Sequence, residues 1–223
     1  MIDWQQIDTV FLDMDGTLLD LNFDNYFWQH HVPQRYAEKY QLSPEQAKAQ
    51  LAMRYKSVEG TIDWYCVDYW THELGLDIAV LKEEVDHLIA VHPHVTDFLD
   101  AVRAANKRML LVTNAHMKSL TLKLQRTQLG GHFDQLICSH DYGVAKEEQA
   151  FWERLREEQP FDPARTLLVD DSLAVLRSAK RYGIGWLLAV YEPDSQQGRR
   201  DVEEFDAIET FLDIMPGRPT SDS

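Results

Sequence analysis

The feature that most constrains this chain is a short apolar run that ends abruptly in carboxylates. Residues Thr9 to Leu12 are apolar or β-branched, which indicates a strand buried on both faces. The segment Asp13-Met14-Asp15-Gly16-Thr17 follows directly. Open α/β sheets bind ligands at the carboxyl ends of their strands, so two carboxylates fall at a candidate site. A simple polar turn is the alternative, because Asp is common in turns.

The spacing of the two carboxylates suits phosphoryl transfer. One carboxylate at the strand end can attack phosphorus and hold it as an aspartyl phosphate. A second carboxylate two residues later can protonate the leaving oxygen and then take a proton from the attacking water. We therefore predict Asp13 as the nucleophile and Asp15 as the general acid and base.

Composition limits the partners of such a site. A chain of 223 residues is long enough for one domain of ordinary size with a small appended domain. Its composition, 44% hydrophobic and 26% charged, allows a buried core. The formal net charge of −15 argues against nucleic acid or an anionic membrane surface as a partner. It would also repel a phosphorylated substrate, so the site must supply local positive charge from a metal ion and a Lys or Arg.

Sequence signals for location and for cysteine chemistry are few. The first residues lack the basic and apolar regions of a signal peptide, and no apolar run is long enough to span a bilayer. We therefore expect a cytoplasmic protein. Cys66 and Cys138 are too few for a disulfide framework, nothing in the sequence places them near a metal pattern, and we expect buried, reduced thiols.

The order of apolar patterns predicts an α/β fold. Helical patterns alternate with further strands, which are expected at residues 109–112, 135–139, 166–169 and 186–190, with a closing strand end and short helix within 205–215. This alternation predicts a doubly wound parallel sheet with right-handed crossovers. We expect a core of residues 1–21 and 92–215, a helical cap at 22–91 inserted after the first strand, and a disordered tail at 216–223.

The expected cap is helical and rich in aromatic residues. Ser43-Pro44-Glu45-Gln46 has the pattern of a capping box at a helix start. Residues 61–74 and 78–89 are each expected to form one helix. Aromatic rings here could stack a nucleobase, although most are expected to pack the interior of the cap. These residues are Phe23, Tyr26, Phe27, Trp28, Tyr36, Tyr40, Tyr55, Trp64, Tyr65, Tyr69 and Trp70.

Polar groups also follow the later strands. Thr113-Asn114 comes after the second strand and could donate hydrogen bonds to phosphate oxygens, although such a pair often caps a helix. Asp170-Asp171-Ser172 comes after the fourth strand, where it could also open the next helix. Lys146 follows the third strand. The carboxyl ends of parallel strands meet at one edge, so we expect these groups to lie together.

The motif D-x-D-G-T-L from Asp13, followed in order by Thr113, Lys146 and Asp170-Asp171, resembles the haloacid-dehalogenase-like phosphohydrolases. The resemblance implies that Thr113 holds the phosphoryl group, together with Asn114 as a second phosphate-binding residue. It implies that Lys146 neutralises charge on the nucleophile and on the phosphoryl group.

The same resemblance implies Mg²⁺ as the cofactor, a hard cation with oxygen ligands. Its protein ligands would be Asp13, the backbone carbonyl of Asp15, and Asp171, with Asp170 bound directly or through water. Members of this family often have Lys-Pro where this chain has Lys146-Glu147. We interpret Glu147 as a change in loop chemistry, since Glu suits a first helical turn.

The run from Asp13 to Trp28, together with T-N-A-H at residues 113–116, is similar to bacterial GMP/IMP 5′-nucleotidases of this family. This similarity implies a small phosphorylated substrate, a purine nucleoside monophosphate, hydrolysed to nucleoside and phosphate. The alternatives are a sugar-phosphate phosphatase or a phosphomutase of the same family, or a catalytically silent scaffold. The sequence leaves the oligomeric state open.

Overall fold

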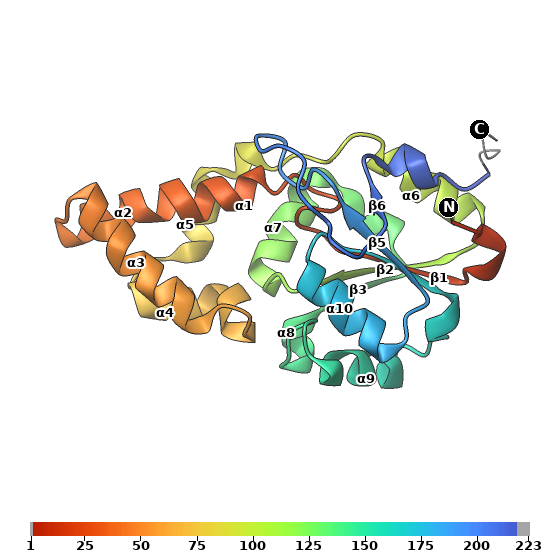
Figure 1. Ribbon diagram of the computed structural model, residues 1–223. Helices are drawn as coiled ribbons and strands as arrows, with labels where there is room; N and C mark the ends of the chain where they lie inside the picture. The colour runs from red at the N-terminus through yellow and green to blue at the C-terminus, as the bar shows by residue number, and fades with distance from the viewer. Residues whose placement is uncertain (1, 218–223) are drawn as a thin grey trace.

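A six-stranded parallel sheet forms the centre of the larger part of the molecule, as the computed structural model of the chain shows for residues 2–217 (Figure 1). The strand order is β3-β2-β1-β4-β5-β6, and every pair is parallel. The strands are β1 (Thr9–Leu12), β2 (Arg108–Thr113), β3 (Gln135–Cys138), β4 (Thr166–Val169), β5 (Trp186–Val190) and β6 (Ala207–Ile208). The predicted doubly wound parallel sheet is confirmed.

Helices follow β2, β3 and β4 in the chain, α6 precedes β2, and together these helices cover both faces of the sheet. The α-helices of this part are α6 (Val95–Ala104), α7 (Met117–Thr127), α8 (Ser139–Tyr142), α9 (Gln149–Glu158) and α10 (Leu173–Tyr182). Short 3₁₀ segments are η1 (Trp4–Gln6), η5 (Leu129–His132), η6 (Pro163–Arg165) and η7 (Phe211–Ile214). The short strand β6 and η7 match the closing strand end and short helix expected within residues 205–215.

Alternation of side chains along each strand divides the interior into two layers. Val10 and Leu12 of β1 pack on one face, against Phe98 of α6 and Phe211 of η7. Phe11 points to the opposite face, where α9 and α10 supply the packing partners. All four residues of β1 are buried, as the apolar run predicted.

A separate group of helices lies between β1 and α6 in the chain and forms the cap, on the left of Figure 1. Its elements are α1 (Asn22–Tyr26), the π-helical η2 (Phe27–His31), α2 (Val32–Tyr40), α3 (Pro44–Val58), η3 (Ile62–Tyr65), α4 (Val67–Leu74), α5 (Ile78–Glu84) and η4 (Asp86–Leu88). The cap has its own hydrophobic core. The capping box at Ser43 is present, because Ser43 and Gln46 exchange side-chain to backbone hydrogen bonds.

Two cap helices are shorter than the sequence pattern predicted. The helix expected over 61–74 is interrupted at Cys66, whose backbone is extended (φ −84°, ψ 112°) and whose Sγ accepts from the Tyr69 amide to begin α4. The helix expected over 78–89 ends at Glu84, because Val85 leaves the helical region (φ −120°) where it packs into the cap core. Apolar periodicity alone does not reveal such interruptions.

Smaller differences occur at element ends. Ser139 begins α8 and is not the last residue of β3, and α9 begins at Gln149, two residues after Glu147. Of the tail expected from residue 216, Pro216 and Gly217 form a turn, and residues 218–223 lie outside the described part. Within residues 2–217, no helix combines the length and the apolar character needed to cross a bilayer.

Candidate active site

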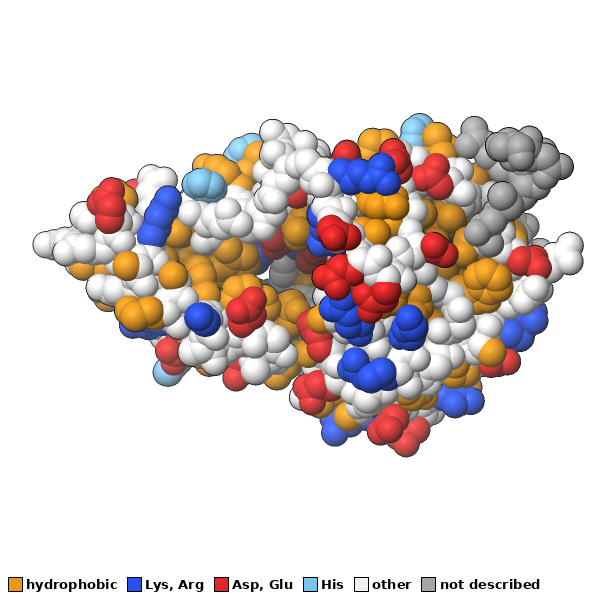
Figure 2. Space-filling model, viewed as in Figure 1, with side chains coloured by type: hydrophobic (Ala, Val, Ile, Leu, Met, Phe, Trp, Pro, Cys, Tyr) orange, Lys and Arg blue, Asp and Glu red, His pale blue; other side chains and the backbone are white. Residues whose placement is uncertain are grey.

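A cavity of about 380 Å³ lies between the carboxyl edge of the sheet and the cap. Figure 2 shows the hollow between the two parts of the molecule, with hydrophobic side chains on the cap side. Its volume is in the range of small-molecule sites. The lining includes all seven site residues predicted from the sequence: Asp13, Asp15, Thr113, Asn114, Lys146, Asp170 and Asp171.

The strand order explains why these residues converge. β1 lies between β2 and β4, so residues that follow these three strands are neighbours at one edge. Gly16 permits the loop that follows β1 to approach closely the loop that follows β4. Its φ is +83°, and a Cβ at this position would lie 2.8 Å from the Cγ of Asp171. The glycine is therefore needed both for its backbone conformation and for space.

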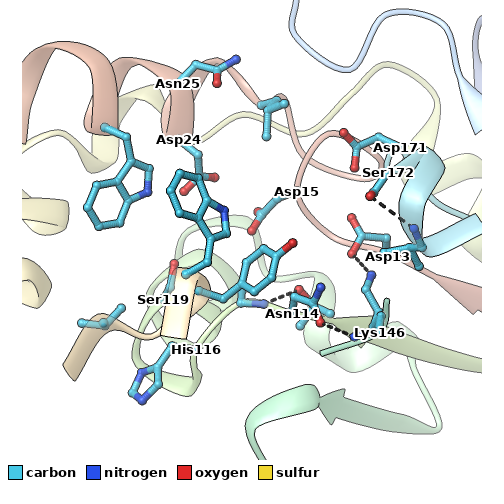
Figure 3. Close-up of a pocket in the computed structure, with 18 of the residues that line it drawn as sticks. Asp13, Asp15, Asp24, Asn25, Asn114, His116, Ser119, Lys146, Asp171 and Ser172 are labelled. Atoms are coloured by element: carbon cyan, nitrogen blue, oxygen red, sulfur yellow. Dashed lines mark hydrogen bonds and ion pairs between the residues drawn. The ribbon is translucent and has the colours of Figure 1, made fainter. Parts of the chain in front are cut away.

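Lys146 connects two of the carboxylates. Its Nζ donates to Asp13, to Asp170 at 2.7 Å and to the Val112 carbonyl at 3.0 Å, and its side chain is buried. Figure 3 shows Asp13 facing Lys146. Burial raises the pKa of Asp13 to about 7, although Lys146 acts in the opposite direction. Burial also disfavours the charged lysine, but Asp13 and Asp170 outweigh this and raise the pKa of Lys146.

Three carboxylates beside Lys146 form a compact oxygen cluster that can hold a metal ion. One oxygen from each of Asp13, Asp170 and Asp171 lies within 4.8 Å of the other two. Burial, followed by the charges of Asp13 and Asp170, raises the pKa of Asp171 well above its usual value. Arg200, with Nη1 3.5 Å from Asp171, is the cation paired with that residue. The cluster therefore has a surplus of negative charge that a cation would balance.

Asp15 belongs to a second buried network, which the sequence did not reveal. Lys123 of α7 donates from Nζ to Asp15 and to Asp24 at 2.6 Å each, and Lys82 of α5 donates to Asp24 at 2.9 Å. Burial raises the pKa of Asp15 to about 6, opposed by Lys123. Burial would also raise the pKa of Asp24, but Lys123 and Lys82 lower it to about 2. Figure 3 shows Asp15 between Asp24 on the cap side and Asp13 on the sheet side.

A sequence signal for this network did exist. Lys123 lies three residues after Leu120 on the buried face of α7, and Lys82 lies four residues after Ile78 on the buried face of α5. A lysine at an apolar position of an amphipathic helix needs a buried partner. Such a pattern indicates an ion pair but does not identify the partner residue.

Thr113, the last residue of β2, and Asn114, which follows it, both hold the neighbouring loops in place. The Asn114 side chain accepts from the Lys146 amide at 2.9 Å and donates to Glu147 at 2.9 Å. The Thr113 hydroxyl accepts from the Ala115 amide at 3.0 Å. Asn114 therefore orients the lysine loop, and its role as a phosphate ligand stays a prediction.

Glu147 is more than a change in loop chemistry. It precedes α9, and its carboxylate accepts from the Tyr65 hydroxyl of the cap at 2.6 Å as well as from Asn114. Burial, with the Glu147 charge, raises the pKa of Tyr65, so the hydroxyl remains a donor. The residue that replaces proline in this loop thus joins the cap to the sheet.

Aromatic residues form the cap wall of the cavity. Of the eleven rings noted in the sequence, four line it: Trp28, Tyr55, Trp64 and Tyr65. Others, including Phe23, Phe27 and Trp70, are buried in the cap core. The wall rings contact one another edge to face, as Trp28 and Tyr55 do at 5.8 Å between centroids.

Comparisons with known proteins identify the family. Residues 7–183 match the family described as haloacid dehalogenase-like hydrolase. Two proteins named GMP/IMP nucleotidase YrfG, from Escherichia coli (strain K12) and Shigella flexneri, are each 40% identical over 215 residues, which is 96% of this chain and 97% of theirs.

Solved structures agree on the fold. A HAD phosphatase from Thermococcus onnurineus superposes with a TM-score of 0.77 at 23% identity, over 93% of this chain and 96% of that one. A putative beta-phosphoglucomutase from Thermotoga maritima superposes with a TM-score of 0.67 at 18% identity, over 93% of this chain and 98% of that one. At these identities the structures show the shared fold alone. From the family match and the extent of the 40% identity, the chain belongs to the haloacid dehalogenase-like hydrolases.

Proposed function

We propose that this hydrolase is a magnesium-dependent purine nucleoside 5′-monophosphatase that acts on GMP and IMP through an aspartyl phosphate. The observation that supports this most directly is the division of the cavity: a carboxylate and lysine cluster on the sheet side faces an aromatic wall on the cap side. A nucleotide has a matching division into an anionic phosphate and an aromatic base. The relatives named GMP/IMP nucleotidase support the choice of base.

The phosphate end of the substrate would bind at the carboxyl edge of the sheet. Lys146 lies beside Asp13 and places a buried positive charge next to the attacking carboxylate. Thr113, at the end of β2, completes this side of the cavity and would donate its hydroxyl proton to a phosphate oxygen. Charge held in place before the reaction is the largest single contribution in most phosphoryl transfers.

The reaction follows in two displacements at phosphorus. A carboxylate oxygen of Asp13 attacks, and the bond from phosphorus to the ribose 5′ oxygen breaks while Asp15 gives that oxygen a proton. Water then attacks the aspartyl phosphate and gives a proton to Asp15. Inorganic phosphate leaves, and Asp13 is regenerated. The raised pKa of Asp15, which burial brings to about 6, suits a group that must both donate and accept a proton near neutral pH.

Asp13, Asp170 and Asp171 fit Mg²⁺, because an all-oxygen cluster with surplus negative charge is what this hard cation requires. They would hold it together with the backbone carbonyl of Asp15. When bound, Mg²⁺ neutralises charge on the phosphate oxygens during transfer. Lys146 keeps Asp13 and Asp170 oriented toward the same point, which favours a single ligand geometry. A cytoplasmic location, predicted from the sequence, belongs with this proposal.

The test is phosphate release from GMP, IMP, AMP and a panel of sugar phosphates, each with Mg²⁺ and with EDTA. We expect metal-dependent release concentrated on GMP and IMP. Asp13→Asn should abolish release while the protein remains folded, since Lys146 keeps its Asp170 partner. Asp8→Asn is the matched control: Asp8 lies just before β1 at the opposite edge of the sheet, is exposed, and pairs with Arg165, which is not among the residues that line the cavity.

The alternatives give different results in the same assay. Faster release of phosphate from sugar phosphates than from GMP and IMP would refute the purine assignment but would not affect the aspartyl-phosphate mechanism. Formation of an isomer without net phosphate would identify a phosphomutase. An active Asp13→Asn variant would refute the nucleophile, and a folded protein inactive on every substrate would favour the silent scaffold.

A further inference from the structure

A second group of metal-binding side chains lies at the boundary between cap and sheet, outside the aspartate cluster. Cys66, His116 and His140 each offer one ligand atom, and these three atoms all lie within 4.8 Å of one another. Cys66 precedes α4 in the cap, His116 precedes α7, and His140 is in α8. Three separate elements from both parts of the molecule therefore bring sulfur and nitrogen donors to one point.

The contacts around this group leave one donor atom without a partner among the described residues, whereas the Nδ1 of His116 accepts from the Lys118 amide at 3.3 Å. The Nε2 of His140 is buried and has no hydrogen-bond partner among residues 2–217. An unpaired buried polar atom is costly, so its position needs an explanation. The rings of His116 and His140 are nearly perpendicular with centroids 5.0 Å apart. The Cys66 sulfur accepts a weak hydrogen bond from the Tyr69 amide nitrogen at 3.4 Å.

The donor set selects a class of metal. Thiolate and imidazole together are typical ligands of Zn²⁺ and related transition-metal ions, whereas Mg²⁺ prefers oxygen. Tetrahedral Zn²⁺ with its usual bond lengths places neighbouring ligand atoms about 3.3–3.8 Å apart. The present separations are within 4.8 Å, so side-chain rotation and a small closure of the cap would complete the geometry.

We propose that Cys66, His116 and His140 bind Zn²⁺ or a related transition-metal ion, with Asp68 as the fourth ligand. Asp68 lies outside the group of donors within 4.8 Å of one another, but its Oδ2 is 3.7 Å from the Nε2 of His116, so the same small closure of the cap would bring it to the ion. Its other oxygen, Oδ1, accepts from Lys118 at 2.5 Å, so one carboxylate can serve both contacts.

The position of the site gives the ion an effect on turnover. Cys66 and Asp68 belong to the cap, whereas the two histidines belong to the sheet part, so a bound ion joins the two. Near this group the Tyr65–Glu147 hydrogen bond and the exposed Lys118–Asp68 pair already connect the cap to the sheet. His116 also lines the active-site cavity. The ion therefore holds the cavity closed and slows hydrolysis, because substrate and product must pass between cap and sheet.

The experiment uses Co²⁺ as a spectroscopic substitute for Zn²⁺, with Mg²⁺ in excess to occupy the aspartate cluster. We expect one equivalent of Co²⁺ to give a thiolate-to-metal charge-transfer band that Zn²⁺ abolishes. Cys66→Ser removes the thiolate but can still cap α4, and should lose the band. Cys138→Ser is the matched control and should keep it. His140→Gln should weaken binding at least about tenfold, a loss typical even of supporting residues in metal sites.

Inhibition of hydrolysis provides the second measurement. Zn²⁺ should inhibit the unmodified enzyme in excess Mg²⁺ and should inhibit Cys66→Ser at least about tenfold less strongly. No charge-transfer band in the folded protein, or a band that persists in Cys66→Ser, would overturn the site. Equal inhibition of both proteins would overturn the closure effect and assign the inhibition to the aspartate cluster. The binding measurement is independent of the substrate, so failure of the purine assignment would not affect it.

Discussion

Replacement of Lys123 by methionine tests whether the buried charge network joins the cap to the sheet. Lys123 is 1% exposed, and its Nζ is the shared partner of Asp15 in the sheet part and Asp24 in the cap. Methionine keeps most of the length and apolar stem of the side chain. The substitution therefore removes the charge and two hydrogen bonds while leaving the packing nearly unchanged.

The expected loss of stability can be estimated from the partners that remain. Removal of one member of a buried ion pair costs about 3–5 kcal/mol, because the other charge is left buried and unpaired. Asp24 keeps Lys82 at 2.9 Å, so Asp15 is the carboxylate left without a cation. The side chain of Asp15 is 22% exposed and that of Asp24 is 18% exposed. Water can therefore reach both carboxylates in part, which favours the lower end of the range of about 3–5 kcal/mol. We therefore expect a loss of about 3 kcal/mol, or a fall in Tm of about 6–12 °C for a chain of this length.

The assay is thermal unfolding of matched variants in the same buffer. Lys118→Met is the control, since it makes the same change in the same helix to another lysine paired with a cap carboxylate. That pair is exposed, 53% for Lys118 and 57% for Asp68, so its loss should cost at most about 1 kcal/mol. Equal shifts for Lys118→Met and Lys123→Met would refute the reasoning. A double-mutant cycle of Lys123→Met with Asp24→Asn should be non-additive, whereas additive effects would show that the two residues act independently.

Two further predictions concern the same boundary. Tyr65→Phe removes the 2.6 Å hydrogen bond to Glu147 and should weaken cap closure by about 1.5–3 kcal/mol, measured as a higher KM for nucleotide with the fold retained; an unchanged KM would contradict this. Asp24 has its pKa lowered to about 2 in the folded state, from 3.8. Its stabilising effect, about 2 kcal/mol, is therefore complete above pH 3.8 and lost as pH falls toward 2. The unfolding free energy of Asp24→Asn should lack this acid-dependent component, and an identical pH dependence in both proteins would exclude Asp24 as its source.

The sheet was predictable from sequence because its signals are local. The strand at Thr9–Leu12 is a continuous apolar run, and parallel strands place their following residues at one edge by geometry alone. The convergence of Asp13, Thr113 and Asp170 at one cavity follows from the strand order. Lys146, in contrast, reaches the cavity from a loop after α8 that Asn114 orients. The bounds of the cap helices were not predictable in this way, because the helix interruptions at Cys66 and Val85 depend on tertiary packing.

Pairings between distant residues were not accessible in the same way. Lys123 and Asp15 are 108 residues apart in the chain, and Tyr65 and Glu147 are 82 apart. Composition and periodicity contain no information on which cation meets which carboxylate. Glu147 shows the consequence: its residue type suited a helix start, whereas its partners determine its function as a contact between cap and sheet.

The two buried networks together explain how a strongly acidic chain can accept a phosphate. Five carboxylates line the cavity, from Asp13, Asp15, Asp24, Asp170 and Asp171. Lys146, Lys123 and Lys82 lie among them as buried cations, and Arg200 pairs with Asp171. If every group is ionised, the fixed charges sum to one negative charge, and a divalent cation reverses that sign. The three lysines and Arg200 therefore leave the site unfavourable for an anion, and the proposed Mg²⁺ would make it favourable for a phosphate. On this reasoning the loss of activity in EDTA should include a loss of substrate binding, and unchanged nucleotide affinity without metal would contradict it.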